Sequence, residues 1–166
     1  DLDLPPETLE ELRAAARRSD TRRRGASMAS GRMLSKKELT ERLTKKGASP
    51  DDAAETADWL EDLGAVDDTA YAGVIVRHYG AMGCGAARVR QELHRRGVPK
   101  ELWDEALEQL PPPQEAIEKF LCAKLRGRPL TPEDSRRLAA ALQRRGFSWQ
   151  DIRPILNGLG QEIDET

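Results

Sequence analysis

Apolar residues recur along this chain at spacings of three and four, the period of a helix with one buried face. In the middle of the chain, Val89 and Leu93 stand four residues apart. The pair Arg95 and Arg96 comes shortly after them, and Gly97 follows. A glycine after an apolar stripe is typical of a left-handed helix cap, and bases in the last turn favour the negative end of the helix dipole. The pattern predicts an amphipathic helix that ends before Gly97.

The same phrase occurs three times at almost constant spacing. It reads LTKKG at 43–47, LHRRG at 93–97 and LQRRG at 142–146. A second apolar stripe begins after each glycine, and SPDD at 49–52 has the composition of a helix start, with a serine cap, a proline and two acids. Each copy therefore predicts two helices joined by a tight turn. Repetition at this period indicates tandem helical units.

A third helix is expected before each of these pairs. Residues 67–83 begin with an aspartate cap, residues 114–125 follow three prolines, and residues 27–33 are a weaker candidate. The chain is therefore predicted to be all-α, with three tandem three-helix, helix-turn-helix-like repeats that form an elongated, curved, solenoid-like rod. The predicted organisation is an N-terminal extension at 1–25, repeats at 26–64, 65–111 and 112–160, and a C-terminal tail at 161–166.

The N-terminal extension is predicted to be partly flexible. Residues 5–18 are expected to form an amphipathic helix through Leu9 and Leu12. The basic run at 17–27 has no apolar period and is interpreted as a flexible connector. The first residues lack the features of a signal peptide, and no apolar run approaches the length of a membrane span.

Composition fits thin helical layers. Aromatic residues make up 4% and charged residues 34% of the chain, so Leu, Ala and Val must do most of the packing. The two cysteines, Cys84 and Cys122, are far apart in sequence and form no disulfide framework. We therefore expect a reducing, cytoplasmic location.

The charges are segregated although the formal net charge is only −2. Residues 13–46 carry twelve Lys and Arg against three acids, and residues 47–70 carry eight acids and no base. Residues 71–100 then carry six bases and one acid, and residues 101–118 carry six acids and no base. The blocks alternate in phase with the repeated phrase, which favours a basic ridge beside an acidic one over simple solvated helix faces.

The middle of the chain resembles the RecX family. The segment VDDTAYAGVIVRHYGAMGCGAARVRQELHRRGV at 66–98 is similar to the central signature of that family, with Tyr71 three residues after the second aspartate and a Gly-x-Gly turn. LSKKELTERLTKKG and LAAALQRRGFSWQDIRPIL are similar to the flanking units, so the resemblance covers about residues 28–158. The chain departs from the family pattern at Gly31 and Leu34, and at Ala86 and Ala87.

The resemblance implies a small, monomeric, cytoplasmic regulator of the RecA recombinase in DNA repair, recombination and the SOS response. Such proteins dock in the groove of the RecA–DNA filament across neighbouring protomers. They inhibit ATPase activity, strand exchange and filament extension, and they make weak DNA contacts. They are not enzymes and use no cofactor.

The basic residues are the candidate partner-binding groups. Arg88 and Arg95 are seven residues apart and share a helix face, and Arg137 and Arg144 repeat that spacing. Stacked repeats would align such pairs into one basic ridge. The full set of candidates is Arg77, Arg88, Arg90, Arg95, Arg96, Lys45, Lys46, Arg137, Arg144 and Arg145.

No motif for catalysis, metal binding or nucleotide binding competes with this interpretation. His and Cys have no zinc-ligand spacing, the paired acids stand at helix starts where capping explains them, and the glycine-rich stretch at 80–85 is not a P-loop. Two alternatives stay open. One is a helix-turn-helix-like DNA-binding protein, against which the acidic second helices argue, and the other is a generic helical scaffold for protein interactions.

Overall fold

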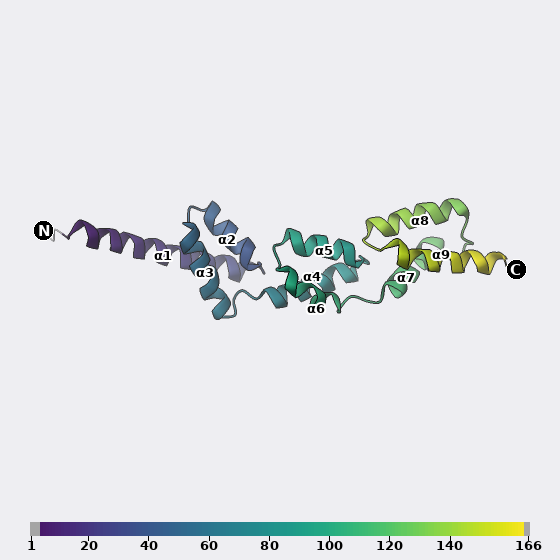
Figure 1. Ribbon diagram of the computed structural model, residues 1–166, viewed down its shortest axis with the longest axis horizontal. Coiled ribbons are helices and arrows are strands. Elements are labelled where there is room, and N and C mark those ends of the chain that lie inside the picture. The colour runs from purple at the N-terminus through teal and green to yellow at the C-terminus, as the bar shows by residue number, and fades with distance from the viewer. Residues whose placement is uncertain (1–3, 165–166) are drawn as a thin grey trace. The chain divides into compact units, whose positions relative to one another are not determined.

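Helices account for the regular elements in the part of the chain that the structure describes (Figure 1). The computed structural model describes the backbone of residues 4–164 and the side chains of residues 4–160. The elements in chain order are α1 (Pro6–Gly31), α2 (Lys36–Lys45), α3 (Pro50–Asp62), α4 (Asp68–Ala81), α5 (Ala86–Arg95), the 3-10 turn η1 (Lys100–Leu102), α6 (Trp103–Leu107), α7 (Pro113–Leu125), α8 (Pro132–Arg144) and α9 (Trp149–Asp164). The all-α prediction is confirmed for the described residues.

The chain forms two units, each with its own internal contacts. Unit 1 consists of Asp1–Tyr71 together with Arg96–Val98. Unit 2 consists of Ala72–Arg95 together with Pro99–Thr166. The division falls inside α4, whereas the predicted repeats meet between 64 and 65 and between 111 and 112. Those repeat boundaries concern the periodicity of the chain and stay predictions.

The core of unit 1 lies between α2 and α3. Ser35 caps α2, because its hydroxyl accepts a hydrogen bond from the Glu38 amide at 3.0 Å while the Glu38 carboxylate accepts one from the Ser35 amide. Ser49 caps α3 in the same way through the Asp52 amide. These caps fix the start of each helix, and the apolar stripes of α2 and α3 face each other. The buried residues of this core are Leu34, Leu39, Leu43, Ala53, Ala57, Leu60 and Val66.

Helix α1 corrects the prediction for the N-terminal region. Residues 17–27, interpreted as a flexible connector, lie within one continuous helix, and the short helix expected at 27–33 is largely the end of the same element. Thr21 and Gly25 are its buried positions. Gly25 lies against α3 so closely that an added Cβ would come within 2.6 Å of Thr56 Cγ2. The helix is held by small residues, which an apolar period does not reveal.

One core cluster of unit 2 gathers the last three helices. Thr131 and Asp134 form a capping box at the start of α8. Leu138 and Leu142 of α8 then pack with residues of α7 and α9. The buried residues of this core are Ile117, Leu121, Leu125, Leu138, Ala139, Leu142, Phe147, Ile152 and Leu156.

The middle helices of the chain are shorter and less regular than expected. The second helix of the middle pair is split into η1 and the five-residue α6. In α4, Ile75 and Val76 are buried, but Val74 is 39% exposed. Val74 therefore lies on the outer face of that helix.

Candidate protein-interaction surface

The ten predicted partner-binding residues lie mostly at helix ends. Lys45 and Lys46 are exposed at the end of α2 in unit 1. Arg88 and Arg90 are exposed in α5, and Arg144 is exposed at the end of α8, all in unit 2. The other five, Arg77, Arg95, Arg96, Arg137 and Arg145, have intramolecular partners that change what they can offer to another protein.

Two of these arginines form ion pairs within their own helix. Arg95 Nε donates to Glu92 Oε1 at 3.0 Å, and Glu92 is only 4% exposed. Arg137 Nη2 lies 3.0 Å from Asp134 Oδ1. The Thr131 hydroxyl and then Arg137 lower the pKa of the Asp134 carboxyl from its ordinary value. These two members of the predicted ridge therefore have part of their charge compensated inside the protein.

The turn that follows Arg95 packs on the start of α2 in unit 1. The Ser35 hydroxyl donates a hydrogen bond to the Arg96 carbonyl while it caps its own helix. Gly97 has a φ of +76°, and a Cβ there would lie 2.8 Å from Lys37 Cβ. Glycine is therefore needed both for the left-handed backbone and for the close approach.

The third copy of the phrase packs on the start of α5 in unit 2. The Gly85 amide donates to the Arg145 carbonyl at 2.8 Å, and the Ala87 amide donates to the Gly146 carbonyl at 3.1 Å. A Cβ on Gly85 would lie 2.5 Å from that Gly146 carbonyl oxygen. The orphan amides at the start of a helix are thus satisfied by the turn of another helix pair.

In the first copy, the corresponding Lys46 carbonyl accepts a hydrogen bond from the Arg24 side chain of α1 at 3.3 Å, and the glycine itself is not closely packed. Gly47 has a φ of +101°, almost equal to the +102° of Gly146, yet nothing lies within 4 Å of an added Cβ. The repeated glycine is therefore a helix cap in all three copies and a packing joint in the second and third. This double role is a physical reason for the repetition of the phrase.

The second base of the later copies lies over an aromatic ring from a preceding helix. The Arg96 guanidinium is 6.0 Å from the centre of the Tyr71 ring, and its Nη1 donates to the Tyr71 hydroxyl at 3.1 Å. The Arg145 guanidinium is 4.7 Å from the centre of the Phe120 ring. In both pairs the ring precedes the arginine by 25 residues. These cation–π contacts fix the position of each guanidinium.

Arg145 also lines a groove of about 500 Å³ in unit 2, which we call the cation groove. One wall is the outer face of α7, and the opposite wall is the end of α4 with the segment before α7. The lining residues are Arg77, Gly80, Ala81, Met82, Gly83, Gln109, Pro111, Glu115, Ala116, Lys119, Phe120, Ala123, Lys124 and Arg145. Four of them are cations and one is a carboxylate.

Three of the four cations of this groove, Arg145, Arg77 and Lys124, contact neutral groups. Arg145 Nη1 donates to the Met82 carbonyl at 3.2 Å, and Arg77 Nη1 donates to Gln109 Oε1 at 2.5 Å. Lys124 Nζ lies 5.8 Å from the centre of the Phe120 ring. Among the side chains that the structure describes, no carboxylate forms an ion pair with Arg77, Lys119, Lys124 or Arg145. Their positive charge is therefore available to a partner.

Lys119 and Lys124 were not among the predicted site residues. Their helix was considered only for its apolar stripe, although 115, 116, 119, 120, 123 and 124 form one continuous helix face. That spacing could have indicated a second, mixed face with two lysines. The sequence could not show that this face of α7 lines a groove together with Arg77 and Arg145, because that depends on tertiary packing.

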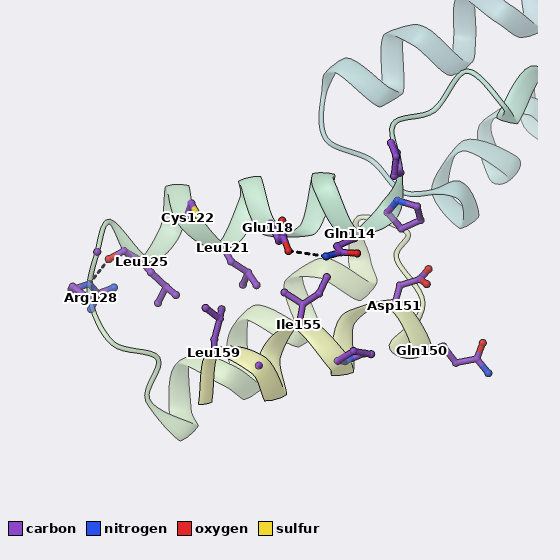
Figure 2. Close-up of a pocket in the computed structure, with 15 residues that line it drawn as sticks. Gln114, Glu118, Leu121, Cys122, Leu125, Arg128, Gln150, Asp151, Ile155 and Leu159 are labelled. Carbon is purple, nitrogen blue, oxygen red and sulfur yellow. Dashed lines mark hydrogen bonds between the residues drawn. The ribbon is translucent and has the colours of Figure 1, made fainter. Parts of the chain in front are cut away.

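A second and larger groove of about 860 Å³ runs between α7 and α9. Figure 2 shows Leu121 and Leu125 of α7 pointing toward Ile155 and Leu159 of α9. The polar side chains at its rim have mixed charge, and Gln114 Nε2 donates to Glu118 Oε1 at 3.1 Å along α7 itself. This groove offers apolar surface without convergent charge.

The described residues contain no cluster with the composition of a metal site. Over that part of the chain, no group of three or more His, Cys, Asp or Glu side chains could hold a metal ion. Cys84 and Cys122 are free thiols. Along the same residues, no helix combines the length and apolar character needed to cross a lipid bilayer.

A family model, curated relatives and solved structures that match this chain all carry the name RecX. Residues 67–107 match the family described as "RecX, second three-helix domain". The regulatory protein RecX of Chromohalobacter salexigens is 35% identical over 123 residues, which is 74% of this chain and 81% of that protein. The protein of the same name from Halorhodospira halophila is 32% identical over 147 residues, or 86% of this chain and 81% of the relative.

Solved structures show the same fold. The crystal structure of RecX from Lactobacillus salivarius has a TM-score of 0.75, with 22% identity over 92% of this chain and 99% of that one. A second crystal structure, described as regulatory protein RecX, has a TM-score of 0.79 with 20% identity over 94% of this chain and 80% of that one.

Proposed function

The chain belongs to the RecX family of regulatory proteins, and from this premise we propose that it regulates the RecA recombinase. In this proposal it binds in the groove of the RecA–DNA filament, across neighbouring protomers. Binding inhibits the ATPase activity, strand exchange and filament extension. The protein acts as a cytoplasmic monomer without catalysis of its own, and any contact with DNA is weak.

The observation that carries the proposal is the likeness to regulators named RecX over about three quarters of the chain. The central signature that the sequence shares with that family coincides with the segment matched by the second three-helix domain. This segment contains α4, which provides Arg77 to the cation groove, and the turn before α5, in which Gly85 contacts the turn after α8.

The basic residues differ in what we expect them to contribute. Arg77 and Arg145, with Lys119 and Lys124, form a group without acidic partners and are the strongest candidates for contact with the filament. Exposed charges of this kind raise the association rate and fix the register of a complex. Arg95 and Arg137 have acidic partners in the protein and are expected to contribute less.

The acidic helices favour a protein surface as the main partner. Asp51 and Asp62 are exposed in α3, and Asp104 and Glu105 are exposed in α6. These carboxylates would repel a duplex that lay across them. A protein surface of mixed charge can complement both kinds of helix.

The test is the DNA-stimulated ATPase activity of a RecA recombinase on single-stranded DNA, with this protein titrated in. We expect the rate to fall when there is much less than one regulator per protomer, because a bound regulator would affect its neighbours in the filament. An unchanged rate, together with a mobility shift of bare DNA at low salt, would contradict the proposal and favour the DNA-binding alternative.

A further inference from the structure

We propose that the cation groove is a receptor for a short acidic peptide segment that carries one apolar side chain. The inference rests on the proposed function, because the segment would belong to a protein of the recombinase filament. Three properties of the groove point to this chemistry: its charge, its apolar lining and its limited size.

The charge of the groove is high for its volume. Four cations and a single carboxylate line a space of about 500 Å³. By contrast, another cavity in unit 1, of about 450 Å³, is lined by Arg17, Arg18, Arg24 and Lys46 but also by Asp20, Asp51 and Asp52. The mixed lining of that cavity leaves little net attraction for either sign. The cation groove attracts carboxylates, which planar guanidinium groups bind with two parallel hydrogen bonds.

The positions of the two arginines are set before any ligand arrives. Arg145 is half-buried and held by the Met82 carbonyl and the Phe120 ring, and Arg77 is held by the side-chain amide of Gln109. Because these partners are neutral, they restrict the rotamers without compensating the charge. Such preorganisation reduces the entropy that is lost on binding.

The apolar part of the lining favours a ligand with an apolar side chain. Met82 is 56% exposed, and Phe120 is partly buried against the core of unit 2. Pro111, Ala116 and Ala123 also line the space. A volume of about 300–1,000 Å³ is typical of ligand sites, so the groove can take one side chain of a peptide with its acidic neighbours at the rim.

Two observations favour a peptide over a nucleic acid. Arg145 and Lys124 already lie over the Phe120 ring, on which a base would otherwise stack. In addition, Glu108 is exposed next to Gln109, which lines the groove. A long polyanion that ran past this segment would meet the Glu108 carboxylate, whereas a short acidic segment confined to the groove would not.

The probe for the test is a short fluorescein-labelled peptide in which glutamates flank one phenylalanine. Its binding to the full chain is measured by fluorescence anisotropy at low salt. The variant is Lys119→Glu/Lys124→Glu, because both side chains are exposed on α7 and lie outside the core. The matched control is Arg13→Glu/Arg23→Glu, which makes the same change of net charge on exposed residues of α1 that are not among the candidate partner-binding residues.

We expect the peptide to bind about tenfold more weakly to the groove variant than to the wild type. The control variant should bind within about twofold of the wild type, and replacing the phenylalanine by alanine should also weaken binding. Circular dichroism should show the same helix content in all three proteins. In the ATPase assay, the groove variant should inhibit less than the control.

Three results would overturn the inference. The first is no peptide binding to the wild type, or equal peptide binding to the groove variant and the control variant. Inhibition of the recombinase by the wild type would then still test the proposed function separately. The second is tighter binding of a thymidine oligonucleotide that is lost in the groove variant, because the site would then take nucleic acid. The third is loss of peptide binding with unchanged recombinase inhibition, which would separate the groove from the filament.

Discussion

At the residue scale, the three glycines of the repeated phrase have the same backbone but different surroundings. Gly47 and Gly146 have φ values of +101° and +102°, so an added side chain has the same left-handed strain at both. Gly146 in addition lies against the backbone amide of Arg88. A Cβ added to Gly146 would lie 2.9 Å from the Gly85 carbonyl oxygen. Only packing distinguishes the two positions, which makes them a natural pair for substitution.

We expect Gly47→Ala to lower the free energy of unfolding by about 1–2 kcal/mol, the cost of a left-handed conformation for a residue with a Cβ. Gly146→Ala should cost about 2 kcal/mol more, because the methyl group meets backbone atoms that cannot move aside. Urea unfolding followed by circular dichroism measures both. An equal loss of unfolding free energy in the two variants would show that the contact between the start of α5 and the turn after α8 does not contribute to stability.

The sequence was informative at this scale where chemistry is local. The glycine caps, the serine and threonine caps and the basic last turns could all be predicted, because each depends on residues three or four positions apart. The Glu92–Arg95 pair has that spacing too and could have been recognised. The Arg145–Phe120 contact could not, because it depends on how the turn after α8 folds back on α7.

At the element scale, α1 is the clearest difference between sequence and structure. Its mean apolar character is low, and Leu9 and Leu12 are 39% and 54% exposed. What holds its second half is the close approach of Gly25 to α3 and the contact of Arg22 with Glu55 and Trp59. A pattern of apolar positions is insensitive to a contact made by glycine and threonine, so the region was interpreted as a connector.

Replacing Gly25 by leucine should separate α1 from α3, since even a Cβ there would meet Thr56 and Leu60. We expect amide hydrogen exchange across residues 17–31 to become at least about tenfold faster, because the helix loses the packing that protects it. Gly31→Leu is the control, as nothing lies within 4 Å of a Cβ at that position. If both variants exchange alike, α1 is not held at Gly25.

At the scale of the whole molecule, the chain belongs to the RecX family, and its basic residues form the proposed binding surface. The paired helices of each repeated phrase were predictable, because caps and apolar stripes mark most of their boundaries, whereas α1 was not. The basic ridge was only partly predictable. Intramolecular acids compensate Arg95 and Arg137, while Lys119 and Lys124 join Arg77 and Arg145 in unit 2. Which charges remain available depends on tertiary contacts, and sequence spacing alone does not determine them.

The measurement that tests the central claim most directly is an electron cryomicroscopy reconstruction of a RecA filament on single-stranded DNA with this protein bound. We expect density for the regulator in the filament groove, in contact with more than one protomer, with the cation groove facing a recombinase segment rich in carboxylates. Density confined to DNA outside the filament, or filaments without bound regulator at saturating concentration, would contradict the account.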